Sequence, residues 1–169
     1  MGREVRKVPK DWQHPKDARG RFRPLFEGCM YTEAKDDFDE ELRKWNARKC
    51  DVPEPSYYDD HNFDDWHGSE PDPAWYMPDW PEKEKTHFMM YENTSEGTPI
   101  SPAFKTPEEL AHWLADTKAS AMAGQGAPYE DWLRVCYGGF APTAVAHTTP
   151  NGLVTIRSGV SGPSKRRVE

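Results

Sequence analysis

The chain has 169 residues, of which 36% are apolar and 30% are charged. This length suits a domain with a buried core, and seven Trp, seven Tyr and seven Phe residues offset the shortage of aliphatic side chains. No apolar run approaches the roughly 20 residues that cross a bilayer, no secretory signal is recognisable, and Cys29, Cys50 and Cys136 form no close pair, so a reduced, cytoplasmic protein is expected.

Charge divides unevenly along the chain. Residues 1–24 carry a net charge of +5 and residues 51–84 carry −10, within a total of −7. Prolines at 9, 15 and 24 disfavour helix around them, so residues 1–30 are predicted to form an extended basic arm that wraps over the core, or alternatively a partly disordered tail. The arm and the acidic region can neutralise each other, or they can be two surfaces with different partners.

Residues 32–49 are predicted to form the first helix. Thr32 is the expected N-cap, and Phe38, Leu42 and Trp45 have the spacing of one apolar stripe. The following region, 51–84, is acidic, aromatic and rich in proline, which excludes long regular elements. Short helical turns are expected at 63–66 and after Asp72.

The C-terminal half contains clearer signals. Residues 86–92 are the best candidate for a central strand, and residues 106–117 are predicted to be a helix with a capping box from Thr106 to Glu109. A second helix is expected at 128–137, and a hairpin around Asn151-Gly152. With a polar tail over 161–169, the pattern predicts a small single α+β domain over 31–160, with short antiparallel strands, about three helices and long Pro-rich coil.

Two stretches carry a resemblance to known proteins. The N-terminus reads Gly2-Arg3-Glu4-Val5-Arg6, then Val8-Pro9 and Trp12; the second stretch begins Tyr91-Glu92 and continues through Thr94-Ser95-Glu96-Gly97-Thr98-Pro99-Ile100-Ser101-Pro102, Phe104 and Thr106-Pro107-Glu108-Glu109-Leu110-Ala111. Both resemble a widespread family of uncharacterised proteins of tailed bacteriophages and prophages. The resemblance implies a small accessory protein made in an infected bacterium, and it supplies no activity, ligand or catalytic residue.

Catalytic motifs are missing from the sequence. There is no P-loop, no His-Glu-x-x-His and no Gly-x-Ser-x-Gly, so an enzyme is disfavoured, no catalytic residue is assigned and no cofactor is expected. One segment has the residue types of a metal site, and a metal-dependent enzyme is the alternative that it suggests; its candidate ligands are Asp60, His61, Asp64 and His67. The competing interpretation is a solvated acidic loop.

Two candidate binding regions remain. The first is a polar turn that could hold a small nucleotide-like ligand, with Tyr91 or Trp113 stacking on it; its residues are Tyr91, Thr94, Ser95, Glu96, Gly97, Thr98, Ser101 and Trp113. The second is the acidic, aromatic region, which could contact a protein or mimic nucleic acid; its residues are Tyr57, Tyr58, Asp59, Asp60, Asp64, Asp65, Trp75 and Tyr76. Both regions can also be read as purely structural.

The leading functional hypothesis is a non-enzymatic phage accessory protein that binds a host bacterial protein, with counter-defence as its context. The alternatives are a binder or sequestering protein for a small nucleotide-like ligand, and a metal-dependent enzyme. Direct binding of nucleic acid is not expected, because the chain as a whole is acidic.

Overall fold

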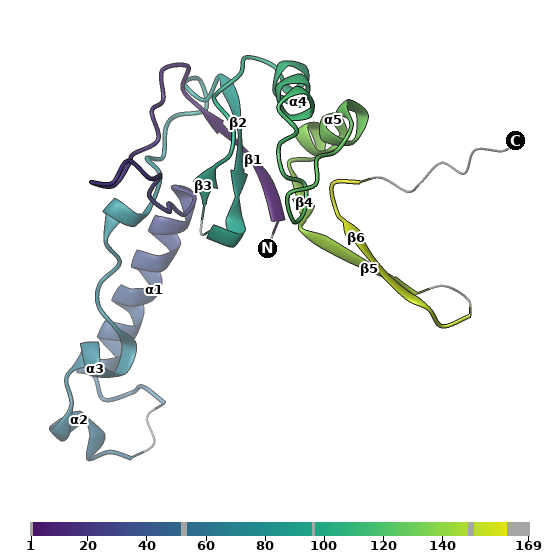
Figure 1. The fold of residues 1–169 in the computed structure, drawn as a ribbon. Coiled ribbons are helices and arrows are strands. Elements are labelled where there is room, and N and C mark those ends of the chain that lie inside the picture. The colour runs from purple at the N-terminus through teal and green to yellow at the C-terminus, as the bar shows by residue number, and fades with distance from the viewer. Residues whose placement is uncertain (1, 52–53, 96, 149–150, 162–169) are drawn as a thin grey trace, which may run out of the picture. The chain divides into compact units, whose positions relative to one another are not determined.

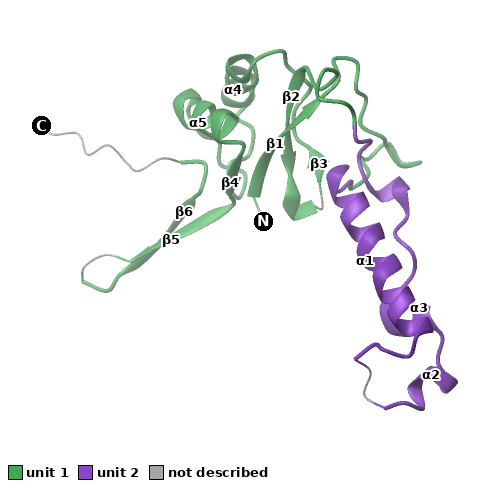
Figure 2. Ribbon diagram, turned by 180° about the vertical axis from the view of Figure 1, so that it is seen from behind, with its two compact units in different colours: residues 1–24, 80–169 green, residues 25–79 purple. Residues whose placement is uncertain are grey.

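The computed structural model describes residues 2–51, 54–95, 97–148 and 151–161 (Figure 1). It confirms the α+β class: antiparallel strands form a four-stranded and a two-stranded sheet, and helices accompany them. The chain divides into two compact units (Figure 2). Unit 1 contains residues 1–24 and 80–169, and unit 2 contains residues 25–79.

The main sheet of unit 1 has the strand order β3-β2-β1-β4. Its strands are β1 (Gly2–Val8), β2 (His87–Glu92), β3 (Thr98–Pro99) and β4 (Phe140–Pro142). β1 pairs with β2 along its length and with β4 at its start. The predicted strand at 86–92 is confirmed as a central strand, but the expected arm over 1–30 begins with a second central strand, which local sequence could not indicate because its pairing partners are distant in the chain.

Two arginines of the expected basic arm are buried in this sheet. Arg3 forms an ion pair with Glu92 at 2.6 Å and donates from Nε to the Ser120 carbonyl. Arg6 pairs with Glu4 at 2.9 Å. Their charges are therefore neutralised within unit 1, by Glu92 and Glu4, which are not part of the acidic region at 51–84.

The sheet is covered on both faces. Val5 lies opposite Met90 in the register, and both pack into the core formed with the two helices α4 (Pro107–Asp116) and α5 (Tyr129–Gly138). Met89 and Tyr91 alternate to the other face and are also buried. Residues Met89 to Tyr91 therefore read as a continuous apolar run rather than an alternating one.

Local signals in the sequence specified both helices of unit 1. Thr106 caps α4 by accepting the Glu109 N–H at 3.2 Å, and Pro107 occupies the first helical position. The Glu109 carboxylate reaches back to the N–H of Lys105 rather than to that of Thr106. α5 ends at Gly138, and the next residue, Gly139, caps it with a φ of +79°, the left-handed conformation expected after a helix C-terminus.

The predicted hairpin is confirmed. Its strands β5 (Ala144–Thr148) and β6 (Val154–Ser158) form the two-stranded sheet, with Thr148 opposite Val154 next to the turn. Across the described residues, no helix is long and apolar enough to cross a membrane. Beyond residue 161, the predicted polar tail lies outside the described residues.

Unit 2 is built on one long helix. α1 (Cys29–Asn46) is followed by α2 (Tyr57–Asp60), α3 (Phe63–His67) and the short 3-10 turn η1 (Pro73–Trp75). α3 and η1 match the expected short helical turns, whereas α2 was not predicted. Phe38, Trp45 and Phe63 form its core.

The expected bounds of the first helix are wrong at both ends. The helix begins before Thr32, at Cys29, directly after its N-cap Gly28. Gly28 packs so closely against the backbone of Met77 that an added Cβ would clash with the Met77 carbonyl oxygen. It ends at Asn46, because Arg48 adopts a φ of +53°.

Leu114 tests where the core of unit 1 lies. Replacing this fully buried side chain by alanine should lower the free energy of unfolding by ~2–5 kcal/mol, because it removes apolar contacts and leaves a cavity. The matched control is Leu153→Ala, since Leu153 is 60% exposed in the hairpin, and it should change the free energy by less than ~0.5 kcal/mol. Urea denaturation measures both; equal losses in the two variants would contradict this assignment of the core.

Candidate ligand-binding site

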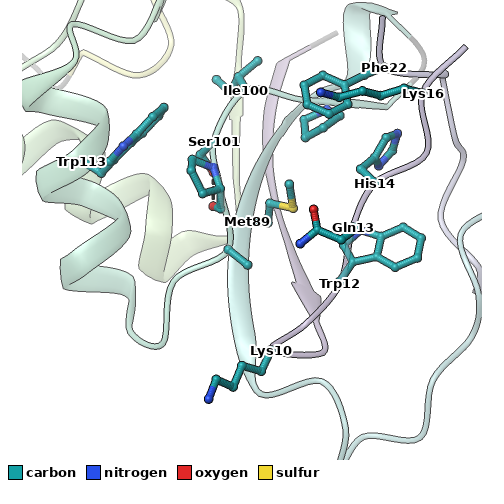
Figure 3. A pocket seen from close by; sticks show the side chains of 13 residues that line it. Lys10, Trp12, Gln13, His14, Lys16, Phe22, Met89, Ile100, Ser101 and Trp113 are labelled. Carbon is teal, nitrogen blue, oxygen red and sulfur yellow. Dashed lines mark hydrogen bonds between the residues drawn. The ribbon is translucent and has the colours of Figure 1, made fainter. Parts of the chain in front are cut away.

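A pocket of about 520 Å³ lies beside the β3 edge of the main sheet, wholly within unit 1 (Figure 3). Its walls come from four parts of the chain: the segment after β1, β2, the segment from β3 to residue 103, and α4. The lining residues are Lys10, Trp12, Gln13, His14, Lys16, Phe22, Met89, Pro99, Ile100, Ser101, Pro102, Ala103 and Trp113.

One wall is a tight loop over residues 15–23. Asp17 closes the loop: its carboxylate accepts the backbone N–H groups of Arg19 and Arg21 and pairs with the Arg21 guanidinium at 2.8 Å. The hydrogen bond from the Arg21 N–H is the main cause of a lowered pKa at Asp17. The loop brings Lys16 opposite Phe22, and the Lys16 ammonium lies 4.8 Å from the centre of the phenyl ring.

A buried hydrogen-bond network attaches this wall to β2. The Trp12 indole N–H donates to the Tyr91 hydroxyl at 3.2 Å, and that hydroxyl lies 3.2 Å from His14 Nδ1. His14 Nε2 lies 2.7 Å from the Arg23 carbonyl, so the neutral ring donates from Nε2 and accepts the Tyr91 proton at Nδ1. Every polar group of the network is thus satisfied with a neutral histidine.

Burial and charge keep the network in that state. Burial lowers the pKa of His14, and the Arg6 guanidinium lowers it further, although the hydrogen bond to the Arg23 carbonyl opposes both. Burial also raises the pKa of Tyr91 to about 12. The Arg6 guanidinium lies 4.6 Å from the centre of the Tyr91 ring.

The opposite side of the pocket is built by Ser101 and Trp113. The Ser101 hydroxyl accepts the Met90 N–H and donates to the Pro102 carbonyl, each at 2.8 Å. The Ser101 hydroxyl thereby continues the hydrogen bonding between β2 and the segment after β3, next to the bond from the Ile100 N–H to the Met90 carbonyl. Trp113 projects from α4 and packs against Phe104, with ring centres 6.0 Å apart.

The electrostatic character of the pocket is positive. Lys10 and Lys16 line it, and its thirteen lining residues, all of them described, include neither Asp nor Glu. Neither lysine is ion-paired with a carboxylate in the described part of the chain, whereas Lys35, Lys44 and Lys85 are. An anionic group bound there would meet two cationic side chains and no carboxylate among the lining residues.

The polar turn predicted to bind a ligand only partly contributes to the pocket. Ser101 and Trp113 line it, but Tyr91 is fully buried and cannot stack on a ligand, because its ring lies in the packed face of the sheet. The hydroxyls of Ser95 and Thr98 bond to each other, and with Thr94 and Gly97 these residues lie outside the lining. Glu96 lies outside the described residues.

Of the lining residues, only Ser101 and Trp113 belong to the ligand-binding set predicted from the sequence. The largest group outside that set lies in the segment after β1, which the sequence predicts as an extended arm; it includes Lys10, Trp12, His14, Lys16 and Phe22. The mixture of aromatic and basic side chains was a usable signal. The pocket itself could not be inferred, because it depends on contacts between residues 77 and 79 positions apart.

The predicted partner-binding residues Tyr57 and Tyr58 pack against the core of unit 2 instead of standing exposed. The Tyr58 hydroxyl donates to the Cys50 carbonyl at 3.0 Å, and Asp59 pairs with Arg48. The aromatic side chains are needed here because unit 2 has few aliphatic residues to bury.

The remaining predicted partner residues have mixed positions. Asp65 caps α3 through a reciprocal pair of hydrogen bonds with Asn62, while Asp60 and Asp64 are exposed. Trp75 is 48% exposed, and Tyr76 is partly buried beside it.

The alternative metal site is not assembled. Within the described ranges, no three His, Cys, Asp or Glu side chains are grouped so that they could hold a metal ion. The four predicted ligands, Asp60, His61, Asp64 and His67, therefore form no such group. The rings face aromatic neighbours instead: His61 stacks on Tyr57 with ring centres 3.9 Å apart, and His67 stacks on Phe63 at 5.0 Å.

Comparisons with protein-family models, with curated proteins and with solved structures found no match. The resemblance to phage proteins, and the context that it implies, therefore stay predictions. The pocket has to be interpreted from its own residues.

The lowered pKa of His14 predicts how stability changes with pH. In the unfolded chain His14 has the ordinary histidine pKa of 6.5, so the unfolded chain binds the proton more tightly than the folded protein does. The contribution of neutral His14 to the free energy of unfolding is therefore fully present above pH 6.5. It is lost as the pH falls toward the lowered pKa of His14 in the folded protein. Denaturation measured from about pH 7.5 to about pH 5.5 should show this decline. His14→Gln should flatten it and His147→Gln, in the exposed hairpin, should not; an unchanged profile in His14→Gln would contradict the assignment.

Proposed function

We propose that this protein binds a small ligand that joins a flat ring to an anionic group, with nucleotides as the class that fits best, in the pocket beside β3. The observation that carries the proposal is the composition of the lining: aromatic rings on opposite sides, two lysines and no carboxylate. The sequence suggests such a ligand as an alternative hypothesis but assigns it to the turn from Tyr91 to Ser101, whereas the proposal here rests on the lining of the pocket.

The aromatic side chains supply the ring-binding part. Trp113 stands on the α4 side of the pocket, while Trp12 and Phe22 stand on the other side (Figure 3). Indole and phenyl rings stack on flat heterocycles with ~1–3 kcal/mol per contact. Met89 and Ile100 add apolar surface between the two sides.

The lysines supply the anion-binding part. Lys10 and Lys16 lie at opposite ends of the view in Figure 3, so a ligand between the aromatic walls can place negative charge toward either of them. Lysine binds phosphate as a mobile point charge. The pocket volume lies within the ~300–1,000 Å³ typical of small-molecule sites.

The polar groups of the pocket favour binding rather than chemistry. Both ring nitrogens of His14 are engaged within the fold, and the Ser101 hydroxyl has both an accepted and a donated hydrogen bond. A nucleophile needs an adjacent base to activate it. These two side chains instead hold the two walls in place.

Thermal unfolding in the presence of nucleotides tests the proposal. A panel of nucleosides, nucleoside phosphates and inorganic phosphate should show stabilisation by at least one nucleotide, because a ligand that binds only the native state raises its stability. The matching nucleoside and phosphate alone should stabilise less, since each supplies only one of the two parts.

Variants locate the site. Lys10→Gln combined with Lys16→Gln should weaken nucleotide binding by about tenfold or more, while Lys83→Gln combined with Lys105→Gln makes the same change of charge at exposed positions outside the pocket. Isothermal titration measures both. Equal affinity in the two double variants, or a panel without any stabilising nucleotide, would overturn the proposal.

A further inference from the structure

A second cavity, of about 360 Å³, lies wholly within unit 2. It is lined by Phe26, Met30, Glu33, Ala34, Asp37 and Tyr76. Four of these six residues are apolar or aromatic and the other two are carboxylates, so this groove differs in charge from the pocket of unit 1.

The groove has a defined backbone frame. Phe26 and Tyr76 form a parallel bridge, in which the Phe26 N–H donates to the Trp75 carbonyl and the Met77 N–H donates to the Phe26 carbonyl, each at 2.9 Å. The Tyr76 ring packs between Phe26 and Tyr31, with ring centres 5.6 and 5.3 Å apart. The backbone bridge and these ring contacts hold Phe26 and Tyr76 in place within unit 2.

α1 supplies the other side of the groove. Met30, Glu33, Ala34 and Asp37 follow the spacing of one helical face. Met30 is 46% exposed, and Phe26 is 36% exposed across from it. Glu33 and Asp37, both exposed, place two negative charges along the same face.

The charge of unit 2 reinforces that of the groove. Residues 25–79 contain sixteen Asp or Glu against five Lys or Arg, a net charge of −11, whereas the rest of the chain is net positive. An approaching segment of positive charge is thus attracted to unit 2 as a whole and meets carboxylates beside an apolar floor.

We propose that the groove formed by Phe26, Met30, Ala34 and Tyr76 docks a basic amphipathic segment of another protein. Its apolar side chains enter the groove, and its Lys or Arg side chains pair with Glu33 and Asp37. Charge complementarity selects this occupant: a second copy of unit 2 would bring the same negative charges together, and nucleic acid is itself an anion. The proposal is independent of the ligand pocket, and its partner chemistry suits a protein that acts by binding another protein.

Fluorescence anisotropy with synthetic peptides tests the docking. The probe is an amphipathic peptide with leucines on one face and lysines on the other, compared with one version in which glutamates replace the lysines and one in which serines replace the leucines. Only the first peptide should bind tightly, and its affinity should fall as salt increases. Equal binding of the serine version would show attraction by charge alone and overturn the groove as the site.

Two double variants separate the groove from the general charge of unit 2. Glu33→Gln with Asp37→Asn should weaken binding of the basic peptide by about tenfold, whereas Asp51→Asn with Asp60→Asn removes two equally exposed charges outside the groove and should weaken it by less than about threefold. Met30→Ser should also weaken it. Equal effects of the two double variants would overturn the proposal. So would a Met30→Ser variant that abolishes self-association of the protein but leaves its affinity for the basic peptide unchanged.

Discussion

The hydrogen-bond network of Trp12, Tyr91 and His14 is the interaction on which unit 1 depends. It attaches residues 10–23 to the face of the sheet that α4 and α5 leave uncovered, and it buries that face without leaving a polar group of the network unpaired. The attached segment covers Met89 and Tyr91, which are both buried. The pocket lies between this segment and Trp113 of α4, beside the β3 edge.

The two units divide the charge of the chain in a way that suits two kinds of ligand. Unit 1 has a pocket lined by lysines and aromatic rings, while unit 2 has an apolar groove lined by carboxylates. Most of the acidic region recognised in the sequence at 51–84, up to residue 79, belongs to unit 2 together with the acidic helix α1. Tyr57 and Tyr58 of this region pack against the core of unit 2.

The sequence predicted those elements whose conformation is set by residues close to one another along the chain. The cap formed by Thr106 and the turn at Asn151-Gly152 rest on backbone preferences of a few residues, and both α4 and the hairpin followed. α1 starts after Gly28, which has no side chain to cap it, and the placement of β1 depends on pairing with β2, so neither had a clear local signal. Ser101 and Trp113, which the sequence predicts as ligand-binding residues, line the pocket, while Lys10 and Lys16 line it through distant contacts that the sequence does not indicate.

Hydrogen exchange on Tyr91→Phe tests the central claim most directly, because this change removes the shared hydroxyl and keeps the buried ring. The amides of Trp12, Asp17 and Arg23, which are hydrogen-bonded within the attached segment, should exchange about fivefold to tenfold faster, as expected for the loss of about 1 kcal/mol, while the Met90 amide in β2 stays protected. Tyr137→Phe, at a 66% exposed tyrosine, is the control. Unchanged protection of residues 12–23 in Tyr91→Phe would contradict the account.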